Sequence, residues 1–308
     1  MSDRDNGTAK LGNSPKPDDG ISDGRQASEK GAPVSFTQGD FEVSVLTDGY
    51  ISVPGEIFAP DLEVEARQTA LSHMKVQNGE VHAQANIPLF RSRRDVILFD
   101  IGAGGGYQPS DGLLQQSLSA VEVSTASITK IVFTHAHPDH IAATLAADGT
   151  LRFPNATYFV GSAEWDFWMD PDFFNKAPLA LHDFGRGAQR DLGAIEERIV
   201  LIKPGDDVMT GIRAIATPGH TPGHLSFEVS GGEGLIIAGD TATSEFVSLE
   251  HPGWRFGYDV LPEIAIESRQ RLLDRATHDR CKMLGFHWNY PGVGFGQRAG
   301  TAYRFIPS

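Results

Sequence analysis

The segment from Ile131 to His140, Ile-Val-Phe-Thr-His-Ala-His-Pro-Asp-His, constrains the chain more than any other. Its first three residues are apolar and predict a short buried strand, and Pro138 breaks this run. Four polar side chains follow within six residues: His135, His137, Asp139 and His140. Such side chains are costly to bury unpaired, but they are good ligands for first-row metal ions. The cluster therefore indicates a metal site at the end of a strand.

The composition limits the classes of protein to which the chain can belong. It has 308 residues, 40% of them hydrophobic, which suits one large layered domain or two small ones. The formal net charge of −14 disfavours nucleic acid as a partner. The single cysteine, Cys281, excludes an intramolecular disulfide. No apolar window approaches the roughly 20 residues of a membrane span, and no signal peptide is visible, so we expect a cytoplasmic protein without a membrane partner.

The domain organisation follows from the distribution of apolar residues. Residues 1–35 are rich in Ser, Asp, Gly, Lys and Pro, which predicts a disordered tail, with a docking arm for a partner subunit as the alternative. Residues 36–308 are expected to form one folded domain. Strands and helices alternate within each half of it, and each half is rich in strands at its start. This pattern favours two sheets packed face to face with helices outside, a four-layer α/β sandwich.

The period of the apolar residues places the individual elements. The predicted helices are 62–74, 113–121, 141–147, 163–169 and 262–276, with Ser162 as N-cap of the fourth. The stretch between the first helix and Asn86 is expected to be irregular. The predicted strands are 41–47, 51–53, 87–90, 96–99, 131–133, 157–160, 197–202, 212–217, 223–229, 235–238 and 281–286. A glycine-rich segment without regular structure is expected to close the chain.

Three later strands each end in a potential metal ligand. His220 follows the strand at 215–217 in a Pro-Gly-His motif, Asp240 follows an apolar run, and His287 follows the last predicted strand. Each of them alone is more simply explained as a turn residue or a hydrogen-bonded polar group. Together with the cluster they give seven imidazole and carboxylate ligands. A set without thiolate suits Zn²⁺, and Mn²⁺, Fe²⁺ or Co²⁺ could also occupy it.

These motifs, His-x-His-x-Asp-His, Pro-Gly-His, Gly-Asp and the late His, resemble those of the metallo-β-lactamase-fold hydrolases. The resemblance covers about residues 41–306 and implies an αββα sandwich with two metal ions, most simply Zn²⁺. It implies that one ion is held by three imidazoles, those of His135, His137 and His220. The other ion is held by a group with one carboxylate, formed by Asp139, His140 and His287, and Asp240 is the bridging carboxylate. His224, four residues after His220, is expected to support the ligands without binding metal.

The end of the chain resembles one group within this family. Residues 287–294, His-Trp-Asn-Tyr-Pro-Gly-Val-Gly, and the closing Tyr-Arg-Phe resemble the corresponding segments of methyl-parathion hydrolase and its lactonase and arylesterase relatives. Aromatic residues line the leaving-group pocket in that group, which makes Trp165, Trp168 and Phe184 candidates for a substrate pocket. Thr243 is a fourth candidate, because smaller acyl-homoserine lactonases carry a tyrosine at that position. The presence of threonine in place of that tyrosine disfavours a dedicated homoserine-lactone enzyme.

The resemblance implies a hydrolase in which a metal-bridging hydroxide opens lactones or cleaves aryl and alkyl esters, with phosphotriesters as a further substrate class. Asp139 is expected to hold the proton of the hydroxide, and Asp240 or solvent to protonate the leaving group. A thioesterase of the hydroxyacylglutathione-hydrolase kind shares all seven ligands, but it would prefer a basic patch, and the chain has 26 basic against 40 acidic residues. Two further hypotheses are a β-lactamase and, outside the enzymes, a metal-stabilised binding or scaffold protein. A homodimer is an open expectation.

Overall fold

The computed structural model describes residues 33–74 and 76–308, so the tail predicted for residues 1–35 lies almost entirely outside the described residues. Among the described residues, regular structure begins at Val34. The first sheet contains β1 (Val34–Gln38), β2 (Phe41–Pro54), β3 (Val76–Gln77), β4 (Glu80–Arg91), β5 (Val96–Phe99), β6 (Lys130–Val132), β7 (Thr157–Gly161) and β8 (Ile199–Ile202). The second contains β9 (Asp207–Met209), β10 (Ile212–Ala216), β11 (Leu225–Val229), β12 (Leu235–Gly239), β13 (Lys282–Gly285), β14 (Val293–Ala299) and β15 (Ala302–Pro307).

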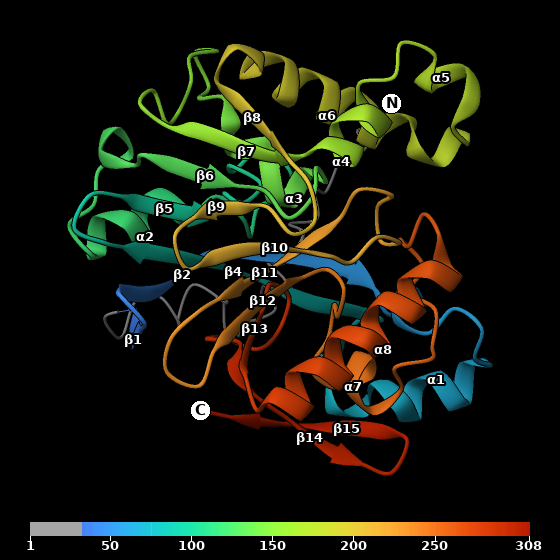
Figure 1. The fold of residues 1–308 in the computed structure, drawn as a ribbon. Coiled ribbons are helices and arrows are strands. Elements are labelled where there is room, and N and C mark those ends of the chain that lie inside the picture. The colour runs from blue at the N-terminus through green and yellow to red at the C-terminus, as the bar shows by residue number, and fades with distance from the viewer. Residues whose placement is uncertain (1–32, 75) are drawn as a thin grey trace, which may run out of the picture.

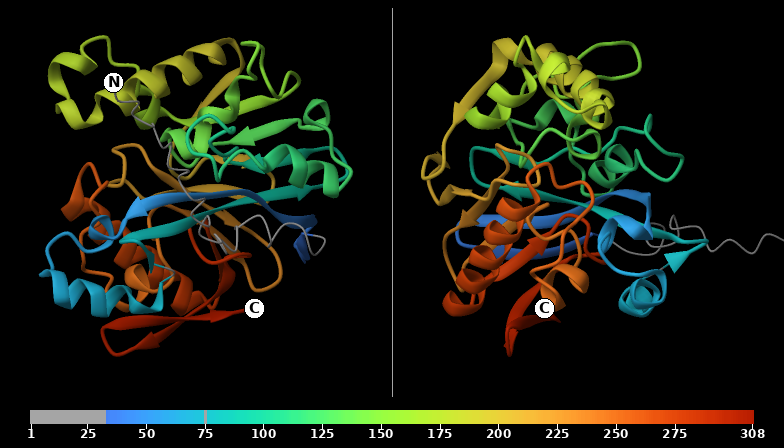
Figure 2. Two further views of the ribbon diagram at one scale, coloured as in Figure 1. Left: turned by 180° about the vertical axis from the view of Figure 1, so that it is seen from behind. Right: turned by 90° about the vertical axis from the view of Figure 1, so that its right-hand side faces the viewer.

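The helices lie on the outer faces of the two sheets (Figure 1). They are α1 (Val64–Ala70), α2 (Leu114–Ala120), α3 (Pro138–Ile141), α4 (Ser162–Trp168), α5 (Phe173–Lys176), α6 (His182–Ala194), α7 (Val247–Glu250) and α8 (Pro262–Asp279). Helices α4, α5 and α6 lie beyond the first sheet, whereas α7 and α8 lie beyond the second, as both views of Figure 2 also show. Among the described residues, no helix is long and apolar enough to cross a membrane.

Strand direction brings several strand ends to one place. The first sheet has the order β1-β2-β4-β5-β6-β7-β8, with β3 beside β4, and the second has the order β15-β14-β13-β12-β11-β10-β9. Strands β5, β6, β7 and β8 run parallel to one another, and so do β12 and β13. Because parallel strands end at the same edge of a sheet, the loops that follow β5, β6, β12 and β13 can converge on a single site.

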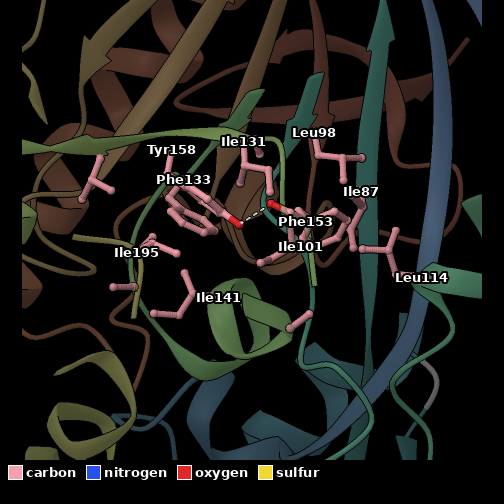
Figure 3. Close-up of a cluster of buried hydrophobic side chains, with 14 of the residues drawn as sticks. Ile87, Leu98, Ile101, Leu114, Ile131, Phe133, Ile141, Phe153, Tyr158 and Ile195 are labelled. Atoms are coloured by element: carbon pink, nitrogen blue, oxygen red, sulfur yellow. Dashed lines mark hydrogen bonds between the residues drawn. The ribbon is translucent and has the colours of Figure 1, made fainter. Parts of the chain in front are cut away.

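Three apolar layers hold the sandwich together. Between the sheets, the rings of Phe99 and Phe227 lie 5.4 Å apart, and apolar residues of both sheets surround them. On the outer face of the first sheet, side chains such as Leu98 and Ile131 pack against Ile141 of α3 (Figure 3). On the outer face of the second sheet, Ile236 and Met283 pack in one cluster with Leu272 and Leu273 of α8. The predicted four-layer αββα architecture is confirmed.

Several local predictions were wrong, each for a physical reason. Strand β4 begins at Glu80 and not after Asn86, because it pairs with β2 as far as Pro54. The helix predicted for 141–147 lies mostly elsewhere: α3 begins at Pro138, whose missing N–H costs nothing at the first turn, and ends at Ile141, before a short 3-10 turn at Ala142–Thr144. Helix α6 was missed because it contains three glycines, which lower helix propensity. The glycine-rich close forms the hairpin β14–β15, which pairing with β13 stabilises.

Candidate metal centre

The predicted ligands meet at the shared edge where the strands end. His135 follows β6, and the backbone of His137 forms the N-cap of α3, which itself carries Asp139 and His140. Asp240 directly follows β12, and His287 follows β13 after one residue. His220 lies in the loop between β10 and β11. All seven side chains are buried or nearly so. The structure therefore brings together every residue that the sequence predicted as a ligand.

The first group consists of the imidazoles of His135, His137 and His220, whose ligand atoms lie within 4.8 Å of one another. His220 Nε2 faces His137 Nδ1 at 2.9 Å. His220 Nδ1 is bonded to the Asp259 carboxylate at 3.0 Å, which places its proton on Nδ1 and leaves a lone pair on Nε2. Either His137 donates to this lone pair, or a cation lies between the two nitrogens.

The second group is built around carboxylates. Asp139, His140 and His287 offer ligand atoms within 4.8 Å of one another, and His287 Nε2 lies 3.2 Å from Asp139 Oδ2. Asp240 lies between the groups, with its oxygens 3.3 Å from His220 Nε2, 3.3 Å from His287 Nε2 and 3.5 Å from His140 Nε2. A carboxylate that reaches both groups has the geometry of a bridging ligand.

The two groups also differ in charge. Burial, reinforced by neighbouring imidazoles, holds the pKa of His135 and of His137 well below its usual range, so both are neutral. Burial opposes the charge of His287 as well, but the carboxylates of Asp240 and Asp139 outweigh it and raise the pKa of His287 to about 10. The pKa of Asp139 is about 2, because His140 and His287 overcome the opposite effect of burial. Neutral imidazole and ionised carboxylate are the forms that bind metal, so His135, His137 and Asp139 are ready for an ion, whereas His287 must release a proton when an ion binds.

The hydrogen bonds of the described residues support a metal at this place. Four buried ligand atoms have no hydrogen-bond partner: His135 Nε2, His137 Nε2, His140 Nε2 and Asp240 Oδ1. A buried polar atom without a partner costs about 1–3 kcal/mol, so four of them in one cluster need an explanation. Divalent cations explain three of them, His135 Nε2, His140 Nε2 and Asp240 Oδ1, because His137 faces His220 through its other nitrogen, Nδ1. The donor set of imidazole and carboxylate fits Zn²⁺ without excluding Mn²⁺, Fe²⁺ or Co²⁺.

Further side chains orient the ligands from behind. His140 Nδ1 bonds to Asp100 Oδ2 at 2.8 Å, and Asp100 directly follows β5. His287 Nδ1 bonds to a main-chain carbonyl of β4, that of Gln84, at 2.8 Å. His224 accepts from the backbone N–H of Asp240 at 3.0 Å, since burial lowers its pKa to about 3 and keeps it neutral. This is the supporting place that the sequence predicted for His224.

Two of these supporting residues were missed by sequence reasoning. Asp100 carried a signal, because it follows a buried strand in the same way as Asp240. Asp259 carried none, since it lies in a loop 39 residues after His220. Its second oxygen lies 3.3 Å from the guanidinium of Arg269, which is fully buried in α8 and also donates to the carbonyls of Thr241 and Trp254. Only the folded structure reveals this chain of contacts.

A cavity of about 1060 Å³ opens beside the ligands. Pro138 and Ala142 form its floor next to Asp139, and Tyr107, Phe184 and Tyr258 are its large aromatic lining residues. Of the four residues predicted to line a pocket, the structure places Phe184 in this wall. The others lie elsewhere: Trp165 packs against the core of the first sheet, Trp168 is completely buried, and Thr243 is buried.

Comparison with known proteins agrees with this geometry. The metallo-β-lactamase superfamily matches residues 83–280, more than half of the chain. N-acyl homoserine lactonase AttM of Agrobacterium fabrum is 32% identical over 121 residues, which are 36% of this chain and 40% of that protein. The chain thus matches less than half the length of this curated relative.

Two solved structures are similar over nearly their whole length. The first is AidC, a dizinc quorum-quenching lactonase in complex with a product, N-hexanoyl-L-homoserine, with 29% identity and a TM-score of 0.83 over 90% of this chain and 97% of that one. The second is AbOPH, a hydrolase of the β-lactamase superfamily, with 27% identity and the same TM-score and coverage. Sequence motifs, fold and ligand geometry lead to one conclusion: the chain belongs to the metallo-β-lactamase superfamily.

Proposed function

We propose that this protein is a binuclear-metal hydrolase that opens lactones and cleaves aryl or alkyl esters. The observation that supports this most directly is the convergence of seven buried ligands, three of them with unpartnered imidazole nitrogens and one with an unpartnered carboxylate oxygen, beside a cavity large enough for a small ester. The similarity to AidC favours lactones within this class. Phosphotriesters are a second substrate class of the same proposal, because they too are attacked by hydroxide at a polarised centre.

The ligands define what each side chain contributes. His135, His137 and His220 would hold one ion, the second group would hold the other, and Asp240 would bridge them. Divalent ions at these places supply Lewis acidity, which generates hydroxide from water near neutral pH and polarises the carbonyl oxygen. Asp139, which is ionised at neutral pH and follows Pro138 of the cavity lining in the chain, would hold the proton of the attacking water.

The source of the leaving-group proton follows from the environment of Asp240. Burial raises the pKa of this carboxyl, but His287 and His140 outweigh burial and hold it well below its usual range. A carboxyl with so low a pKa is ionised at neutral pH and has no proton to donate. We therefore favour solvent, and not Asp240, as the donor to the leaving alkoxide or phenoxide.

Two phenols complete the cavity. Burial, together with the charge of Asp139, raises the pKa of Tyr107 to about 12 and raises the pKa of Tyr258. Both hydroxyls therefore stay protonated and can donate a hydrogen bond to a substrate oxygen. They offer the phenolic donor that Thr243 cannot supply, so the argument from Thr243 against homoserine lactones loses weight.

A second candidate activity is thioester hydrolysis, which a specific observation favours. The cavity is lined by three guanidinium groups, those of Arg152, Arg186 and Arg190, and by the carboxylate of Asp183, while Asp191 pairs with Arg190. The arginines outnumber these two carboxylates by one, on a protein of net charge −14. A thiol carrier with carboxylates, such as glutathione, would be attracted to such a wall.

One substrate panel tests both candidates. Purified protein, stripped of metal and then reloaded with Zn²⁺, Mn²⁺ or Co²⁺, is assayed with γ- and δ-lactones, aryl acetates, a paraoxon-type triester and a hydroxyacylglutathione thioester. We expect the highest kcat/KM with a lactone and no turnover after complete removal of metal. Higher kcat/KM with the thioester than with any lactone would select the second candidate. Turnover that survives metal removal would refute the mechanism.

A further inference from the structure

One buried carboxylate connects the two chain segments that carry the first ligand group. Glu164 lies in α4, is 1% exposed and accepts four hydrogen bonds. Its Oε1 accepts from the backbone N–H of Ala136 at 2.9 Å and from the indole N–H of Trp168 at 2.6 Å. Its Oε2 accepts from the hydroxyl of Thr221 at 2.6 Å and from the backbone N–H of Gly223 at 3.1 Å.

The partners of Glu164 are the immediate neighbours of the ligands. Ala136 separates His135 from His137 in the chain, and Thr221 directly follows His220. The two segments are 83 residues apart in sequence at His137 and His220, yet their imidazole nitrogens approach to 2.9 Å. A single carboxylate that bonds to both segments therefore determines how far apart the imidazoles lie.

The packing around Glu164 is tight, which indicates that the distance between the two ligand segments is closely fixed. The indole ring of Trp168, held by Glu164, lies edge-on to the imidazole of His137 with the ring centroids 5.8 Å apart. Gly223 has no side chain where a Cβ would lie 1.9 Å from the backbone nitrogen of Glu164. Any larger residue at Gly223 would push α4 away from the ligand loop. The close approach of α4 thus depends on this glycine.

We propose that Glu164 is a positioning residue for the three-imidazole group: by joining the loops of His135–His137 and His220 it sets their spacing for one metal ion. This inference rests on the proposed metal centre and extends it to a residue that touches neither ligand side chains of the second group nor substrate. Loss of an outer partner of metal ligands typically lowers metal affinity by about 10- to 100-fold. The same range is expected here, confined to one of the two ions.

The substitution that tests this is Glu164→Gln, which keeps the shape of the side chain. Glutamine has one acceptor oxygen and one NH₂ donor, so at least one of the backbone N–H groups of Ala136 and Gly223 loses its acceptor. Bound zinc is counted after equilibration with a graded chelator series, without any activity assay. We expect the wild-type protein to hold two ions and Glu164→Gln to lose one of them at a chelator concentration about 10- to 100-fold lower.

A matched control is available in α6. Asp191 is also a buried carboxylate, 1% exposed, but its hydrogen bonds go to the guanidinium of Arg190 and not to a ligand segment. Asp191→Asn should lower the thermal stability of the metal-free protein, as Glu164→Gln does, and leave both ions at wild-type affinity. The variant His287→Ala shows which ion Glu164 affects, because the ion that it retains lies in the three-imidazole group. Adding Glu164→Gln to this variant should lower the affinity for that ion.

The outcomes distinguish a positioning role from a merely structural one. If Glu164→Gln keeps both ions at wild-type affinity while its stability falls as in Asp191→Asn, Glu164 is merely structural and the inference is wrong. If the wild-type protein itself binds no divalent ion, the proposed metal centre fails first. Should Glu164→Gln not fold, Thr221→Val removes one donor to Glu164 without changing shape, and it must weaken the same ion by several-fold or the inference is again wrong.

Discussion

The two ligand groups are held by different parts of the fold. In the three-imidazole group, His220 depends on Asp259 and through it on Arg269 of α8, and all three ligands depend on loops that Glu164 of α4 connects. In the second group, the supports are Asp100 at the end of β5 and a main-chain carbonyl of β4. The first group thus depends mainly on helices on both outer faces of the sandwich, although Asp100 also reaches His135 through the hydroxyl of Thr134. The second group depends on strands of one sheet.

The difference in support goes with a difference in charge. The imidazoles of His135 and His137 are neutral and have no carboxylate of their own to balance a cation, whereas the second group has Asp139 and shares Asp240. The second group can therefore hold itself together through ion pairs of its own. The first depends on positioning from outside. From this contrast we expect that remote substitutions disturb the first group and that removal of the shared carboxylate disturbs both.

The largest effect is expected from Asp240→Ala. Its carboxylate oxygens lie 3.3 Å from both His220 Nε2 and His287 Nε2, so its removal takes a ligand from each group. We expect turnover of the best lactone to fall by at least about a thousandfold, or about 4 kcal/mol in activation free energy. Metal analysis should show fewer than two ions per chain. A variant with two ions and near-wild-type turnover would show that Asp240 does not link the groups.

The pH dependence of stability can be assigned to the ligand groups only after a third region is accounted for. Asp48 is fully buried and accepts from the backbone N–H groups of Ala103 and Leu114. Burial raises its pKa from 3.8 to about 6 in the folded state, despite those hydrogen bonds. A raised folded pKa means that this group contributes stability below pH 3.8, and the contribution is lost as the pH rises through 6.

Asp48→Asn should therefore change the slope of stability against pH. A difference of about two pKa units corresponds to about 3 kcal/mol, so the free energy of unfolding of wild type relative to Asp48→Asn should fall by up to that amount, mostly between pH 4 and 6. Chemical denaturation of both metal-free proteins across this range gives the difference. If the free energies of unfolding of the two proteins run parallel against pH, the group that titrates in this range is not Asp48.

The contrast between the groups is tested directly by a pair of substitutions, Asp259→Asn and Asp100→Asn. Each weakens the carboxylate partner of one imidazole, that of His220 or that of His140. We expect each to lower the affinity of one ion by about 10- to 100-fold in a chelator titration. In the His287→Ala background Asp259→Asn should weaken the remaining ion more than Asp100→Asn does, because Asp100 reaches His135 only through the hydroxyl of Thr134. Equal effects of both substitutions there would mean that the groups are not separately supported.

Part of this arrangement could be predicted from sequence because it is local. Four ligands lie within six residues, and the other three each follow an apolar strand, so chain order and strand direction bring them together. The supports could not be predicted in this way. In the sequence, Glu164 is an ordinary acidic residue in an aromatic helix, because its role depends on contacts with segments 28 to 59 residues away. Asp259 is an ordinary turn residue, because its partner His220 lies 39 residues away. Helix α6 was not predicted because its glycines lower helix propensity. Tertiary packing, such as that of Gly185 against Phe173, stabilises the helix nevertheless.

The smallest effect is expected from Cys281→Ser, which distinguishes this donor set from one that includes thiolate. Cys281 is 7% exposed, directly precedes β13 and packs in the apolar layer beneath α8, where burial raises the pKa of its thiol. A protonated thiol in that layer is core material and not a ligand. We expect both ions to be retained and the free energy of unfolding to fall by about 1 kcal/mol, since a hydroxyl is less easily buried than a thiol. Loss of one ion would overturn the division into two groups of imidazole and carboxylate, because the ligand set would then have to include sulfur.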